Sequence, residues 1–269
     1  MVTRVLAGLA LVCALFIATA CNQASPSALA AGPVAAAVSL PEVPGAPPPI
    51  RVAVIQDKTV SGKGNRTPQI QWEHLQSLID AASTHGGEVA FGIIHPRESR
   101  PLVRLRVTEP PTLEPEPMAS NPLEKRRLAR KHAEWEATKT ASENEWLERQ
   151  LPRVQAFSDG AQLLLRWPAD GQRSAVWAGV RRAVAFLAEP APRGATPPRK
   201  FLLVSSDGDD DTGGVPVDVP PDVTVLLVSG NGDAGQLESL GGERYESIEA
   251  ACAAIAAASD VGSPTASSN

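Results

Sequence analysis

The chain has 269 residues, a formal net charge of −5 at pH 7 and 43% hydrophobic residues. This composition is sufficient to form a buried core of one domain. The acidic balance excludes the basic surface that nucleic-acid binding requires, so we expect no nucleic-acid partner.

The first 20 residues have the pattern of a secretory signal peptide: Arg4 is followed by an apolar run over residues 5–18. The end of this run, Ala18-Thr19-Ala20-Cys21, resembles the cleavage site of a bacterial lipoprotein, in which the cysteine is lipidated after cleavage. An ordinary signal peptide with an incidental cysteine is the alternative. We expect residues 1–20 to be removed and Cys21 to carry a membrane anchor.

The resemblance to a lipoprotein implies export to the bacterial cell envelope. Asn22 stands where some bacteria place an aspartate as an inner-membrane retention signal, and this favours the outer membrane or the periplasmic face. Cys13 would be lost with the signal peptide, so Cys252 is left without a disulfide partner or a cysteine metal site. We expect Cys252 to fill space in the core.

The domain organisation follows from composition. Residues 21–49 are rich in alanine and proline and are predicted to form a semi-stiff tether. Residues 259–269 are predicted to be a disordered tail. The remaining residues, 50–258, are predicted to form one domain with a helical insertion at 109–160, and we expect it to be a monomer.

The first half of this domain reads as strand, helix and two strands. Residues 50–56 form an apolar run typical of a buried strand. A helix is predicted to begin at Thr67-Pro68, to present one apolar face to the core and to end at Gly86-Gly87. Strands are predicted at 89–94 and at 102–107. In the second, Arg104 and Arg106 alternate with apolar residues, which indicates a solvent-exposed face or a sheet edge.

The insertion begins with a proline-rich loop over 109–122. A heavily charged helix is predicted from residue 123 to about residue 150, with sparse apolar positions, so its surface is either solvated or a contact surface for a partner. Residues 161–167 read as a short strand or a helix end.

The second half continues the alternation of strands and helices. Helices are predicted at 174–187, 236–240 and 248–258, the last of them capped by Ser247, and strands at 201–205, 223–228 and 244–246. This alternation predicts an α/β fold with a doubly wound, mostly parallel sheet and helices on both faces.

Oxygen-bearing side chains follow two strands of this sheet. Asp57, Thr59 and Ser61 come after the first strand, and Asp207 follows the strand at 201–205. If these strands are parallel neighbours, both aspartates lie at the carboxyl edge, where open α/β sheets bind ligands. Such oxygen atoms suit a hard cation. The alternative is that Thr59 and Ser61 only hydrogen-bond the turn.

The chain resembles a von Willebrand factor type A domain. That family carries Asp-x-Ser-x-Ser after its first strand, here Asp57-Lys58-Thr59-Val60-Ser61. It carries a threonine ahead of a later helix, here Ser174, and Thr-Asp-Gly after its fourth strand, here Ser206-Asp207-Gly208. The resemblance covers residues 50–258 apart from the insertion. Val60 departs from the glycine that is common at its position.

The resemblance implies a Rossmann-like fold with a metal-ion-dependent adhesion site. The implied ligands are Asp57, Thr59, Ser61, Ser174 and Asp207, and the implied ion is Mg²⁺, with Mn²⁺ or Ca²⁺ as alternatives. The ion would bridge to an acidic residue of a protein ligand. The expected activity is therefore protein binding and not catalysis.

Two other functions remain open. Asp57-Lys58-Thr59 also resembles the nucleophile motif of haloacid-dehalogenase-like phosphatases, in which the aspartate attacks phosphorus; Lys200 could then neutralise phosphate. Alternatively, the domain is metal-free and uses the 123–150 helix as its contact surface.

Overall fold

The structure is a computed structural model, and it describes residues 47–60, 67–95, 101–111, 125–230 and 234–260. The predicted signal peptide, Cys21, most of the tether and residues 261–269 lie outside the described residues. None of the described helices combines the length and the apolar character that crossing a membrane requires.

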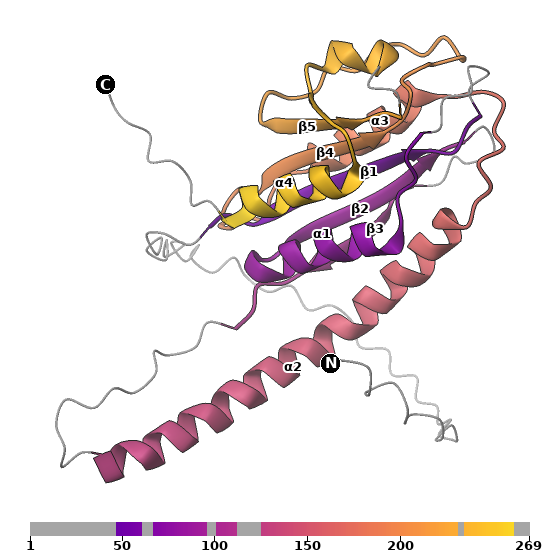
Figure 1. The fold of residues 1–269 in the computed structure, drawn as a ribbon. Helices are drawn as coiled ribbons and strands as arrows, with labels where there is room; N and C mark the ends of the chain where they lie inside the picture. Colours follow the sequence, from indigo (N-terminus) through magenta and orange to yellow (C-terminus); the bar gives the residue numbers. More distant parts are fainter. Residues whose placement is uncertain (1–46, 61–66, 96–100, 112–124, 231–233, 261–269) are drawn as a thin grey trace, which may run out of the picture. The chain divides into compact units, whose positions relative to one another are not determined.

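The described residues form a mixed α/β fold around a six-stranded sheet with the order β3-β2-β1-β4-β5-β6 (Figure 1). The strands are β1 Ile50–Asp57, β2 Gly87–Ile94, β3 Val103–Val107, β4 Arg199–Ser205, β5 Val223–Val228 and β6 Glu243–Tyr245. The helices are α1 Trp72–His85, α2 Lys125–Leu165, α3 Val176–Leu187 and α4 Ile248–Asp260, with a 3₁₀ helix at Gly235–Leu240. Neighbouring strands are parallel except β2 and β3.

The central strand β1 is buried on both faces, which explains its nearly continuous apolar sequence. Val52 and Val54 pack into a core formed with α1, α4 and the C-terminal part of α2. Ala53 and Ile55 pack into a second core formed with α3. Figure 1 shows α1 and α4 side by side on one face of the sheet.

The start of α1 differs from the prediction. The helix begins at Trp72 with Gln71 as its N-cap, and the predicted start at Thr67-Pro68 is wrong. The carbonyl oxygen of Pro68 instead accepts a hydrogen bond from the Ser205 hydroxyl at 2.6 Å, which ties this loop to the end of β4. The predicted end is confirmed, because Gly86 closes the helix with a φ of 75°.

Helix α2 is longer than predicted, and its expected end near residue 150 is wrong, because the helix continues to Leu165. Pro152 lies inside the helix, where a proline costs about 3 kcal/mol. Phe157, Ala161 and Leu164 follow at helical spacing and are buried in the core with β2 and β3. Their burial offsets the cost of the proline, and the residues from 161 are the helix end.

The other predicted elements are found within about two residues of their expected bounds. β3 is an edge strand with Arg104 and Arg106 exposed, as predicted. The Ser247 hydroxyl accepts the backbone N–H of Ala250 at 3.1 Å and caps α4. This helix reaches Asp260, two residues beyond its predicted end at 258. Cys252 is buried in the core, and burial raises the pKa of its thiol to about 11.

We expect Phe157→Ala to lower the free energy of unfolding by about 3–5 kcal/mol, because it opens a cavity between α2 and the sheet. Leu163→Ala is the matched control: Leu163 is on the same helix but 63% exposed, so its loss should cost less than about 0.5 kcal/mol. Urea unfolding of both variants measures the difference. Equal effects would contradict the packing of the second half of α2 on the sheet.

Candidate functional site

The candidate site lies at the carboxyl edge of the sheet, between β1 and β4. These strands are parallel neighbours, with Gln56 aligned to Ser205 at their ends. The strand order reverses here, since β2 and β3 lie on one side of β1 while β5 and β6 lie beyond β4. Open α/β sheets bind ligands in the crevice at such a switch point.

The carboxylate of Asp57 stands at the centre of this edge and is 1% exposed. Its Oδ1 accepts hydrogen bonds from the backbone N–H of Thr59 at 2.9 Å and from the Thr59 hydroxyl at 2.6 Å. Its Oδ2 accepts from the hydroxyls of Ser174 at 3.1 Å and Ser206 at 2.8 Å. Three loops therefore converge on one buried carboxylate.

Burial raises the pKa of Asp57 above its ordinary value, although the hydrogen bonds from Thr59, Ser206 and Ser174 act in the opposite direction. No basic side chain is bonded to Asp57 among the described residues. The neighbouring Lys58 is buried and donates from Nζ to the carbonyl oxygen of Leu165 at 3.1 Å. Burial lowers the pKa of Lys58. Among the described residues, the Asp57 carboxylate is therefore stabilised by hydrogen-bond donors and not by a basic partner.

The hydroxyl oxygen atoms are the chemically available groups of the site. A hydroxyl has one proton and two lone pairs, and Thr59, Ser174 and Ser206 each direct the proton to Asp57. One lone pair of Ser206 accepts the backbone N–H of Gly208 at 3.0 Å. The remaining lone pairs are those that a hard cation prefers. In this arrangement Asp57 positions the hydroxyls by accepting their hydrogen bonds.

The structure brings together three of the five predicted ligands: Asp57, Thr59 and Ser174. Ser61 lies outside the described residues. Asp207 is nearby in the chain and 7% exposed, and its Oδ1 accepts the backbone N–H of Asp209 at 3.2 Å. The prediction omitted Ser206, although the hydroxyl-Asp-Gly pattern at 206–208 contained the signal for it.

The loop after β4 is held by a second aspartate that the sequence did not single out. Asp210 accepts the backbone N–H of Trp177, at the start of α3, at 3.0 Å and that of Gly214 at 3.1 Å. Burial raises the pKa of Asp210, but these hydrogen bonds and those from Thr212 outweigh it and lower the pKa below its ordinary value. Asp210 therefore ties the β4 loop to α3, beside Ser174.

Gly208 is required in the same loop. Its φ is 78°, and an added Cβ would lie 1.7 Å from the carbonyl oxygen of Ala234. No larger residue fits this close approach between the loops after β4 and β5, so the glycine after Asp207 has a packing role.

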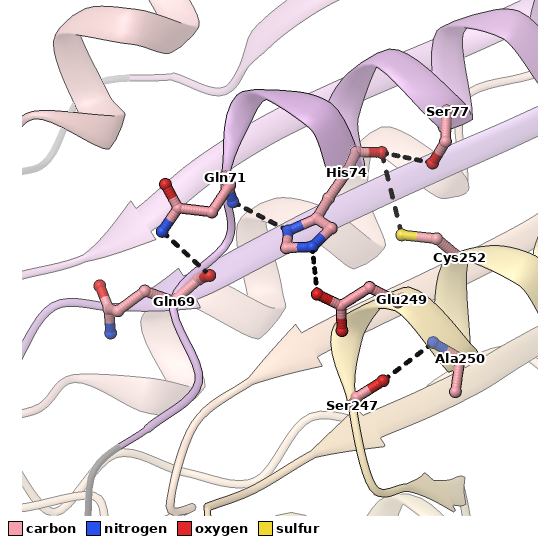
Figure 2. Close-up of polar contacts among 8 residues, drawn as sticks. All are labelled: Gln69, Gln71, His74, Ser77, Ser247, Glu249, Ala250 and Cys252. Carbon is pink, nitrogen blue, oxygen red and sulfur yellow. Dashed lines mark hydrogen bonds and ion pairs between the residues drawn. The ribbon is translucent and has the colours of Figure 1, made fainter.

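A separate polar cluster joins α1 to α4 (Figure 2). His74 Nδ1 accepts the backbone N–H of Gln71 at 2.9 Å, so Nε2 carries the proton of the neutral ring and donates it to Glu249 at 2.8 Å. The Gln71 side chain donates to the carbonyl oxygen of Gln69 at 3.4 Å. This cluster holds the loop between β1 and α1 against α4, and it explains the late start of α1.

Among the described residues, no three His, Cys, Asp or Glu side chains are grouped so that they could hold a metal ion.

Comparisons of the chain with protein-family models, with curated proteins and with solved structures found no match.

The raised pKa of Asp57 makes stability depend on pH. A folded-state pKa above the ordinary 3.8 contributes stability that is present below that value and is lost as the pH rises through the raised pKa. In chelator, we therefore expect Asp57→Asn to gain stability relative to the wild type between about pH 4 and pH 7. Urea unfolding across this range measures the difference in free energy of unfolding between the variant and the wild type.

Asp222→Asn is the control for this experiment. Asp222 is an exposed aspartate that binds Lys200 at 2.7 Å, and this hydrogen bond lowers its pKa. Its contribution to stability is complete above about pH 4 and is lost only at lower pH, so the difference in free energy of unfolding between this variant and the wild type should stay nearly constant from pH 4 to pH 7. If the difference in free energy of unfolding from the wild type changed equally with pH for both variants, the claim that burial makes the charge of Asp57 costly would be contradicted.

Proposed function

We propose that this protein is a lipid-anchored protein of the bacterial cell envelope. Its von Willebrand factor A-like domain, with a doubly wound sheet, binds a divalent cation and through it an acidic residue of a protein partner. The observation that carries the proposal is the buried Asp57 carboxylate, which accepts hydrogen bonds from hydroxyls of three loops at the switch point of the sheet.

The residues present fit a hard divalent cation. Thr59, Ser174 and Ser206 offer hydroxyl oxygen atoms, and Asp207 offers a carboxylate one residue further along the β4 loop. Mg²⁺ suits an all-oxygen site, with Mn²⁺ or Ca²⁺ as alternatives. Ser61 belongs to the proposed set on its sequence position alone.

The proposed cation also accounts for the electrostatics of the site. Asp57 is a buried charge without a basic partner among the described residues, and burying an unpaired charge is costly. A bound cation would supply the missing positive charge. Because the hydroxyl ligands are neutral, the cation would keep most of its charge and attract a carboxylate from a partner.

The phosphatase alternative is less well supported. Each oxygen of Asp57 already accepts two hydrogen bonds, so the carboxylate has little free electron density for attack on phosphorus. Lys200 lies near the start of β4, at the opposite edge of the sheet, where it binds Asp222 at 2.7 Å. It is not placed to neutralise a phosphate group at Asp57.

The test is thermal and urea unfolding of the processed chain in chelator and then with Mg²⁺, Mn²⁺ or Ca²⁺. At a hundredfold excess over the dissociation constant, the cation should add about 2.7 kcal/mol of stability. The gain should disappear in Asp57→Ala and Ser206→Ala and remain in Asp222→Ala, an aspartate variant at the opposite edge.

Absence of any stabilisation by the three ions in the wild type would overturn the cation site. Phosphatase activity that is lost in Asp57→Asn would favour the enzyme. Partner capture that survives chelator but fails without residues 123–150 would favour the metal-free module.

A further inference from the structure

Helix α2 crosses the sheet from one edge to the other. At its C-terminal end, the carbonyl oxygen of Leu165 accepts a hydrogen bond from Lys58, at the carboxyl edge of β1. Near its middle, Trp146 Nε1 donates to the Thr108 carbonyl at 3.1 Å and Gln150 donates to the Thr108 hydroxyl at 2.6 Å. Thr108 follows β3, whose last residue Val107 aligns with the first residue of β2, so it lies at the amino edge.

The first half of α2 therefore extends beyond the amino edge. Residues 125–145 precede the contacts with Thr108 and cover about 30 Å at roughly 1.5 Å per residue. In this half the side chains described, from Leu128 to Glu145, are exposed or half-buried. The beginning of α2 thus points away from the edge that holds Asp57.

The same amino edge receives the chain from its N-terminal tether. Pro49 precedes β1, and its carbonyl oxygen accepts the backbone N–H of Arg199 at the start of β4, at 2.8 Å. Residues 22–49 separate Cys21 from β1, and a chain of this length can span at most roughly 90–100 Å. The extended half of α2 is shorter than this span, so it can reach the surface to which Cys21 is attached.

The end of α2 on this side is strongly basic. Residues 125–131 contain two lysines and three arginines and no acidic residue, in a chain whose net charge is −5. The Arg130 side chain is 84% exposed, and Lys131 is exposed as well. The ion pair of Arg130 with Glu134 at 3.2 Å is an exposed i,i+4 pair, which holds the arginine only weakly.

We propose that this basic end, residues 125–131, binds the anionic head groups of the membrane that holds the anchor. The inference rests on the lipid anchor of the proposed function. Arginine and lysine clusters of this size bind anionic lipid surfaces, and a basic patch adds a second attachment to an acyl anchor. Contact at the amino edge turns the opposite edge, with Asp57, away from the membrane and toward partners.

The test uses the processed chain with Cys21→Ser, which cannot be acylated, so that binding does not come from the lipid. Sedimentation with vesicles in chelator compares phosphatidylcholine alone with mixtures that contain phosphatidylglycerol, at low and high salt. We expect binding to the anionic vesicles only, and its loss at high salt. Each neutralised charge should lower the partition coefficient about fivefold, so Arg130→Gln with Lys131→Gln should lower it roughly 25-fold.

Arg149→Gln with Arg153→Gln is the matched control, because both residues are exposed and on the same helix, and Arg149 forms an i,i+4 pair with Glu145. These changes should have little effect on binding. Circular dichroism and melting temperature confirm that both double variants fold.

Three results would overturn the inference: equal binding to neutral vesicles, equal loss in the control pair, or retention by immobilised polyglutamate without binding to anionic vesicles. The last would assign the patch to an acidic protein. Cation stabilisation on the same samples depends on Asp57, and the mass of the anchored protein reports acylation of Cys21. Failure of either part of the proposed function is thus distinguishable from failure of the lipid contact.

Discussion

The burial of one carboxylate, that of Asp57, is the constraint around which the carboxyl edge is organised. A charge that is 1% exposed needs donors on both oxygen atoms, and no basic side chain among the described residues supplies them. The donors come from the loop after β1, the loop after β4 and the segment before α3. Asp210 then ties the β4 loop to α3, and Gly208 lets the β4 loop pack against the loop after β5, so the geometry of the hydroxyls depends on the whole edge.

The two edges of the sheet have different chemistry. The carboxyl edge gathers hydroxyl donors around a buried carboxylate, while the amino edge receives the N-terminal chain and has the basic end of α2 beyond it. Helix α2 connects the two, since its last turn binds Lys58 and its middle binds Thr108. In the proposed membrane contact, this arrangement would turn the edge with Asp57 away from the membrane.

Most strands and helices were predictable because their apolar periodicity matches their burial. The failures come from contacts between residues that are distant in the sequence. The late start of α1 depends on Ser205 and His74, which are distant from Pro68 and Glu249 in the sequence. The continuation of α2 past Pro152 depends on tertiary burial of Phe157. In the site, the residue types after two strands indicated Asp57 and Asp207, and the family resemblance indicated Ser174, but only the geometry shows that Ser206 donates to Asp57.

The central claim is that the hydroxyls around Asp57 hold a divalent cation. Paramagnetic broadening by substoichiometric Mn²⁺, read from the backbone amide signals of the processed chain, tests it most directly. We expect broadening of the Thr59, Ala175 and Gly208 signals, reversed by excess Mg²⁺, with signals at the amino edge such as that of Lys200 unaffected. Broadening centred on the exposed acidic residues of α2 or on Asp222, with Thr59 and Gly208 unchanged, would contradict it.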